Sequence, residues 1–230
     1  MKTLTARKVI DSFSDSTLHA LQRACATVGQ KARPEAFRHI QPHSHATARL
    51  ARHFVTSCYR HGAGLTPTPE EIECGAYLHD IGKYFIQDSV LLKPGALDED
   101  ERAVMSMHPV YGAAVVSRLT DATEAIRRAV FYHHEHWDGT GYPDGLCGTS
   151  IPFEARVVSV VDVYTSLRSR RSYKSTLSKK GTVEVLSEMA GGKLDPYLTE
   201  DFIVWLSRIS HIGKLNSPLR PAPPAYGFCD

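Results

Sequence analysis

Apolar residues recur at helical spacing along most of this chain, whereas the two-residue alternation of a half-buried strand is hard to find. A helix that buries one face repeats its apolar positions every three or four residues, and this period is the main sequence signal for secondary structure. In residues 15–32, one such stripe carries Leu18, Leu21, Ala24, Cys25 and Val28. We therefore expect an all-α fold in which several helices pack around a shared core.

Capping signals divide this pattern into separate helices. Thr68 suits the N-cap of one helix, and Pro69 suits its first position because the amide hydrogen that proline lacks has no partner there. Another helix should run from about His43 to His61 and stop at Gly62. Further helices are expected within residues 97–119, with a break at His108-Pro109, and within residues 121–136 (capped by Asp121), 152–169, 178–192 and 198–210.

The length and composition of the chain are those of an ordinary globular protein. Of 230 residues, 42% are hydrophobic and 23% are charged, and the net charge of +2 is too small to predict binding to a nucleic-acid polymer or a membrane. No apolar run could span a bilayer, and the first residues lack the apolar stretch of a signal peptide. Five scattered cysteines indicate reduced thiols rather than a disulfide framework. We therefore expect a cytoplasmic location.

Histidines are frequent, at 12, and their positions matter more than their number. Asp162 stands among valines, and a buried carboxylate needs a partner such as a cation. A single histidine on an apolar face is usually a core residue, but a series of candidate ligands on five predicted helices or helix ends favours a metal centre. Imidazole and carboxylate without thiolate suit iron, manganese, nickel, cobalt or zinc and do not select one. The candidates are His43, His79, Asp80, His108, His133, His134 and Asp162.

The adjacent pair His79-Asp80 adds a geometric condition. Neighbouring residues in a helix point about 100° apart, so both can serve one ion only at the end of a helix. Gly82 favours such an end. An aspartate that bridges two ions relaxes the condition, and ligands spread over several helices suit two divalent ions in the core of a bundle.

In order along the chain, these residues resemble the HD-GYP family of HD phosphohydrolases. The resemblance covers residues 39–205, and Gly141-Tyr142-Pro143 is its most specific element. It implies an HD-type multi-helix bundle with the metal centre in its helical core. The matching segments are HSHATARLA (43–51), LHDIGK (78–83), VLLKPGAL (90–97), HPVYG (108–112), HHEHWDGTGYPDGL (133–146), VVDVY (160–164) and RRSYK (170–174).

The activity that the resemblance implies is hydrolysis of cyclic di-GMP, a bacterial second messenger, to pGpG, GMP or both by metal-activated hydroxide. Asp80 would lie between two divalent ions, with iron or manganese expected before nickel, cobalt or zinc. Lys83 would act with Asp80 in catalysis. The implied metal ligands are His43, His79, Asp80, His108, His133, His134 and Asp162, and the implied substrate contacts are Lys83, Tyr142, Arg171 and Lys174.

The chain departs from the family pattern at positions that affect the number of ions and the final product. Ala46 replaces a common arginine, and Thr165 replaces a carboxylate. His39 stands where members with three ions have glutamate, so we expect two ions rather than three. The product, pGpG or GMP, stays open.

Two other functions stay open on the sequence alone. One is an HD phosphohydrolase that acts on another nucleotide or cyclic dinucleotide, and the other is a catalytically weak cyclic di-GMP sensor or adaptor. A diguanylate cyclase or regulator would then be a partner, and a homodimer is a further alternative. We divide the chain into an N-terminal helical segment (1–38), a catalytic domain (39–212) and a Pro-rich tail (213–230).

Overall fold

The computed structural model describes residues 34–60, 67–169, 177–209 and 220–221. In these residues the secondary structure is helical apart from two short parallel strands, β1 (Tyr59–Arg60) and β2 (Arg220–Pro221). The all-α expectation is confirmed. The helix expected within residues 15–32 lies outside the described residues, as does most of the Pro-rich tail.

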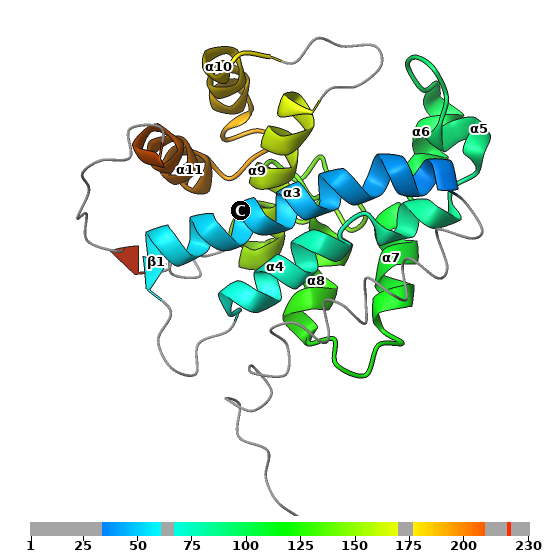
Figure 1. Ribbon diagram of the computed structural model, residues 1–230, viewed down its shortest axis with the longest axis horizontal. Coiled ribbons are helices and arrows are strands. Elements are labelled where there is room, and N and C mark those ends of the chain that lie inside the picture. Colours follow the sequence, from blue (N-terminus) through cyan, green and yellow to red (C-terminus); the bar gives the residue numbers. More distant parts are fainter. Residues whose placement is uncertain (1–33, 61–66, 170–176, 210–219, 222–230) are drawn as a thin grey trace, which may run out of the picture.

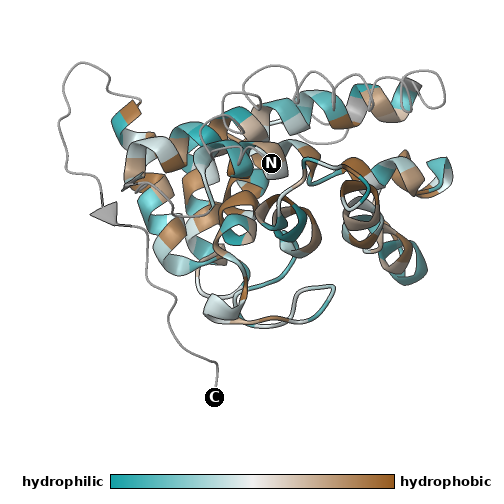
Figure 2. Cartoon of the chain, turned by 90° about the horizontal axis from the view of Figure 1, so that it is seen from below, coloured by the Kyte–Doolittle hydropathy of each residue, from teal (hydrophilic) through white to brown (hydrophobic). Residues whose placement is uncertain are grey.

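A long helix, α3 (Pro34–Cys58), crosses one face of the molecule (Figure 1). It begins nine residues before the start expected near His43, and it passes through Pro42. Proline removes one helical hydrogen bond, but Ala36 and Ile40 of this first part are buried against Tyr84, and this packing offsets the loss. Hydrophilic and hydrophobic residues alternate along α3 in Figure 2, as expected of a helix with one buried face.

The predicted cap of α4 (Pro69–Leu78) is confirmed. The hydroxyl of Thr68 accepts a hydrogen bond from the amide of Glu71 (3.2 Å), and the Glu71 carboxylate accepts one from the amide of Thr68 (2.7 Å). These reciprocal bonds form a capping box, which satisfies two amides that the helix leaves unpaired. The helix ends at Leu78, and a turn leads into the 3₁₀ helix η3 (Ile81–Phe85), so His79 and Asp80 do lie at a helix end.

The remaining helices follow the expected order. Their ranges are α5 (Asp88–Leu91), α6 (Glu99–Met105), α7 (His108–Val116), α8 (Glu124–Tyr132), the 3₁₀ helix η4 (Gly148–Ser150), α9 (Phe153–Arg168), α10 (Lys179–Met189) and α11 (Pro196–Ile209). The expected break is present, but it lies at Ser106-Met107, and His108 and Pro109 are the first residues of α7 because proline fits the first turn of a helix. The cap of α8 is Thr123 rather than Asp121, because the Thr123 hydroxyl accepts from the amide of Ile126.

The core lies where α3, α4, α8 and α9 meet, with α11 on the far side of α9 from α7 (Figure 1). Phe54 of α3 packs edge-on against Phe202 of α11, with ring centroids 5.0 Å apart. α9 is buried along most of its length, which explains why its apolar residues show no single stripe. This central position of α9 carries Asp162 into the interior of the bundle.

No helix in the described part of the chain is long and apolar enough to cross a bilayer. Cys58 and Cys74 are not disulfide-bonded, as expected. Cys147 is disulfide-bonded, so the expectation of reduced cysteines is wrong there, since sequence spacing does not say which thiols a fold brings together. α3 runs without a break across residue 38, and the division into 1–38, 39–212 and 213–230 stays a prediction.

Candidate metal centre

Five separate segments bring all seven predicted ligands to one place in the bundle. The contributors are α3, the turn after α4, the start of α7, the turn after α8 and the middle of α9. Two groups of three side chains have ligand atoms within 4.8 Å of one another: His43, His79 and Asp80 form one, and His108, His133 and His134 form the other.

Asp162 adjoins the first group. Its Oδ1 atom lies 2.7 Å from Nε2 of His43 and 3.6 Å from Nε2 of His79. Residue 43 is on α3 and residue 162 on α9, so this carboxylate reaches the group from a different helix. The valine-rich context predicted a carboxylate that needs a partner, and Asp162, whose side chain is 17% exposed, has two imidazole neighbours.

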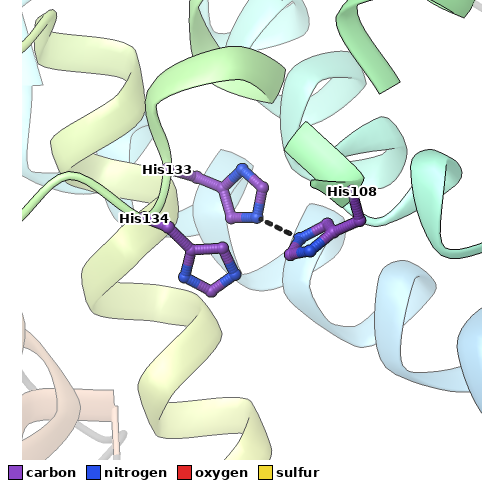
Figure 3. A group of neighbouring side chains, drawn as sticks. All are labelled: His108, His133 and His134. Carbon is purple, nitrogen blue, oxygen red and sulfur yellow. Dashed lines mark hydrogen bonds between the residues drawn. The ribbon is translucent and has the colours of Figure 1, made fainter. Parts of the chain in front are cut away.

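The second group consists of imidazoles alone (Figure 3). His133 and His134 follow α8, and His108 faces them from the first residue of α7. The Nε2 atoms of His108 and His133 are 3.2 Å apart, and the ring centroids of His133 and His134 are 4.2 Å apart. Burial leaves His108 and His133 each 1% exposed.

Asp80 connects the two groups. Its Oδ2 atom lies 3.4 Å from Nε2 of His79, and its Oδ1 atom lies 3.3 Å from Nε2 of His108. Lys83, one turn further along in η3, places Nζ 2.6 Å from Oδ2. One carboxylate therefore faces both groups, which is the arrangement that lets an aspartate bridge two ions.

Three of the histidines make the same kind of hydrogen bond to the backbone. Each donates from Nδ1 to the carbonyl oxygen three residues earlier: His79 to Ala76 (2.7 Å), His108 to Met105 (2.8 Å) and His133 to Val130 (2.8 Å). These carbonyls belong to the last turns of α4, α6 and α8, where a helix lacks partners for its oxygens. The ring hydrogen on Nδ1 leaves Nε2 free to act as a metal ligand, and such a bond also orients the ring.

The residues present fit a divalent cation. Nε2 of His79 and Oδ1 of Asp80 are buried and have no hydrogen-bond partner in the described part of the chain. Buried polar atoms are normally paired, so an orphaned imidazole nitrogen beside an orphaned carboxylate oxygen needs an explanation. A cation between the groups would satisfy both atoms and the facing lone pairs of His108 and His133.

The carboxylates are held in their charged form. Burial acts to raise the pKa of Asp80, but His79 and Lys83 outweigh it and hold the pKa well below its usual range. Burial also acts to raise the pKa of Asp162, and the hydrogen bond from His43, together with the nearby imidazole of His79, holds it well below the usual range. Both groups are therefore anionic at neutral pH, as metal ligands must be.

The imidazoles differ in the direction in which their pKa values are shifted. Burial, together with neighbouring imidazoles, holds the pKa values of His133 and His134 well below that of a free histidine, so both rings are neutral. Burial also acts to lower the pKa of His79, but Asp80 and Asp162 outweigh it and raise the pKa to about 10. In the absence of an ion, the two carboxylates therefore favour the protonated form of His79.

The glycine-rich loop lies directly against the second group. A Cβ atom on Gly141 would come within 2.2 Å of the amide nitrogen of His136 and 2.6 Å of the carbonyl carbon of Glu135, so only glycine fits. Gly141 is not among the positive-φ glycines of this loop, which are Gly139, Gly145 and Gly148, so the close approach is the reason for glycine here. Tyr142 stacks on His134.

Two polar features of this region carried no clear sequence signal. Glu135 is 2% exposed and accepts backbone hydrogen bonds from the loop. Thr165, which stands in place of a carboxylate, points to α3, where its hydroxyl is 2.9 Å from that of Thr47. Arg171 and Lys174, the remaining predicted substrate contacts, lie outside the described residues, and so does the side chain of His39.

The fold and site define a class of protein: the sequence pattern of the HD domain family matches residues 33–198, and the chain belongs to that family. Relatives place it in the HD-GYP branch. It is 45% identical over 126 residues to the cyclic di-GMP phosphodiesterase response regulator RpfG of Xanthomonas campestris pv. campestris, covering 54% of this chain and 33% of that protein. It is 33% identical over 203 residues to a probable cyclic di-GMP phosphodiesterase of Vibrio cholerae, covering 85% and 45%.

A third relative is named for another nucleotide. The 3'3'-cGAMP-specific phosphodiesterase 2 of Vibrio cholerae is 34% identical over 165 residues, covering 70% of this chain and 32% of that protein. The chain thus spans less than half the length of these relatives. Among solved structures, an HDG"Y"P protein of Bdellovibrio bacteriovorus superposes with a TM-score of 0.60 at 17% identity, covering 87% of this chain and 68% of that one. This likeness confirms the HD-type helical fold.

Proposed function

We propose that this chain is a metal-dependent phosphodiesterase that hydrolyses cyclic di-GMP. The observation that carries the proposal is Asp80, whose two carboxylate oxygens lie within 3.4 Å of imidazoles from different groups. A carboxylate between two histidine clusters is the donor set of a two-ion centre, and such centres suit phosphate-ester hydrolysis. The names of several HD-GYP relatives support cyclic di-GMP as the substrate.

The proposed ligands divide between two divalent ions. His43, His79 and Asp162 would hold one ion, His108, His133 and His134 the other, and Asp80 would contact both. Nitrogen and oxygen donors without thiolate suit iron or manganese, with nickel, cobalt and zinc as alternatives. No third ion is proposed, because His39 replaces the glutamate of members with three ions.

When bound, the ions would activate water and stabilise the charge that develops on the phosphate. Asp80 would hold them at a set separation, since its carboxylate is buried. Lys83, whose side chain is partly exposed beside Asp80, would contact a non-bridging phosphate oxygen. Tyr142, Arg171 and Lys174 complete the proposed substrate contacts.

The experiment is hydrolysis of cyclic di-GMP by protein loaded under anaerobic conditions with Fe(II), Mn(II) or Ni(II). We expect the substrate to be consumed and pGpG or GMP to appear, and we expect Asp80→Ala to remove both metal and activity. If none of the three loaded preparations cleaves cyclic di-GMP, the proposal is wrong.

A second candidate substrate is 3'3'-cGAMP. Three relatives are named 3'3'-cGAMP-specific phosphodiesterases. Parallel assays that compare kcat/KM for the two cyclic dinucleotides decide between them. A homodimer is a separate possibility. The remaining alternative function is a sensor or adaptor role, with a diguanylate cyclase or regulator as partner. It would apply if the cellular output survives in Asp80→Ala. The cytoplasmic location stays a prediction from the sequence.

A further inference from the structure

His134 differs from the three histidines whose Nδ1 atoms are bound to helix carbonyls. No hydrogen bond from the described part of the chain reaches its ring, although it belongs to the same group as His108 and His133. A ligand imidazole without such a bond has no polar contact to set its plane. Something else must orient it.

Tyr142 supplies the contact that His134 lacks. The two rings are stacked, with centroids 4.9 Å apart and planes inclined by 28°. The amide of Tyr142 also donates to the carbonyl oxygen of His134 (3.1 Å), so backbone and ring are held together. The imidazole also meets His108 and His133, with centroids 4.9 and 4.2 Å away. The plane of His134 is therefore set by its aromatic neighbours.

Glu135 in turn holds the loop that carries Tyr142. Its Oε1 atom accepts from the amides of Asp144 (2.7 Å) and Gly145 (3.1 Å), and its Oε2 atom accepts from the amide of Leu146 (3.0 Å). Three successive amides on one buried carboxylate form strong, charge-assisted hydrogen bonds. Gly141 allows the same loop to lie directly on the backbone of residues 135–136.

We infer that Glu135 and Tyr142 are positioning residues for His134. The carboxylate of Glu135 fixes the loop, the loop fixes the ring of Tyr142, and that ring fixes the imidazole plane of His134 before any ion binds. The consequence for catalysis rests on the proposed function, whereas the orientation of the ring does not. Tyr142 thus has a task besides the substrate contact proposed for it.

The test compares four variants of the full chain. Glu135→Gln keeps the shape but turns an amide NH₂ group toward a backbone donor, and Tyr142→Leu removes the stacked ring. Tyr142→Phe keeps the ring and removes the hydroxyl. Glu154→Gln is the matched control, because Glu154 is also 2% exposed but pairs with Arg128, outside both ligand groups.

Two measurements are made on each protein. The first is the NMR signals of the His134 ring nitrogens in metal-free protein, and the second is Co(II) affinity followed by visible absorption. We expect Glu135→Gln and Tyr142→Leu to shift or broaden the His134 signals and to weaken one Co(II) site by about 10- to 100-fold, the usual effect of losing a residue that orients a ligand. Tyr142→Phe and Glu154→Gln should resemble the wild type in both.

The inference is overturned if Glu135→Gln and Tyr142→Leu keep wild-type ring signals and Co(II) affinity. It is also overturned if Glu154→Gln changes the ring signals and the Co(II) affinity as much as Glu135→Gln does. Loss of any buried carboxylate would then produce the effect. Neither measurement contains a nucleotide. If the ring signals respond as expected while no loaded preparation cleaves cyclic di-GMP, the proposed function fails and the positioning role stands.

Discussion

The Nε2 atoms of His108 and His133 face each other at 3.2 Å, although each ring already donates through Nδ1 to a helix carbonyl. Two neutral rings in this state present lone pairs to each other, and burial excludes the water that would separate them. The arrangement is unfavourable alone and favourable around a cation. It gives the bundle a direct energetic link between folding and metal binding.

Metal should therefore stabilise the fold. A ligand that binds only the folded state at 100 times its Kd adds about 2.7 kcal/mol to the free energy of unfolding. We expect the midpoint of thermal unfolding to rise on addition of Mn(II) and to fall with a chelator. Asp80→Asn should lose most of this response. An equal rise in the variant would show that the ion binds elsewhere.

Metal affinity should increase with pH because of His79. Its pKa is raised to about 10, so below that pH an ion at Nε2 must displace a proton. Affinity should rise about tenfold for each pH unit and level off near the pKa. Titration calorimetry in buffers of different ionisation enthalpy should record release of one proton. Affinity that does not vary with pH would contradict this.

The raised pKa of His79 also makes the stability of the metal-free protein depend on pH, but this stability falls as pH rises. A histidine whose pKa is raised stabilises the folded state fully below its unfolded pKa of 6.5, and this contribution is lost as pH rises through about 10. Denaturant unfolding of metal-free protein across this window should show the loss. The variant His79→Gln should show less of it, and an identical pH profile in the two proteins would contradict the prediction.

Gly141→Ala should distort the glycine loop. The added Cβ meets backbone atoms of Glu135 and His136, which cannot move aside as a flexible side chain does. We expect a loss of about 1–3 kcal/mol in the free energy of unfolding, as for other overpacked sites. Gly192→Ala is the control, because its Cβ would come no closer than 3.7 Å to Asp138. Denaturant unfolding measures both, and equal effects would refute the steric explanation.

The hydroxyls of Thr47 and Thr165 should be energetically coupled. Their contact joins α3 to α9 one turn beyond His43 and Asp162. Thr165→Val and Thr47→Val should each cost about 1 kcal/mol, with a double variant that costs less than the sum. Thr182→Val is the matched control, because the buried Thr182 hydroxyl donates to the carbonyl oxygen of Ser178, the N-cap of the same helix. Additive effects of Thr47→Val and Thr165→Val would contradict the coupling.

Local sequence signals predicted much of this architecture. Thr68 and Pro69 mark the start of α4 because capping depends on residues within one turn. The helix end at His79-Asp80 was predicted for the same reason. The seven candidate ligands were recognised because their residue types and order carry chemistry that does not depend on exact geometry.

Other features depend on contacts between distant segments. The start of α3 at Pro34 follows from packing of Ala36 and Ile40 on Tyr84, which no capping signal reports. The reason for Gly141 is the approach of a loop to the backbone of Glu135, and the role of Thr165 is a hydroxyl on another helix. Sequence determined the helices and the donor set, since both are local properties. The bridging place of Asp80 and the orientation of His134 came from tertiary packing, because both depend on segments that only the folded bundle brings within contact.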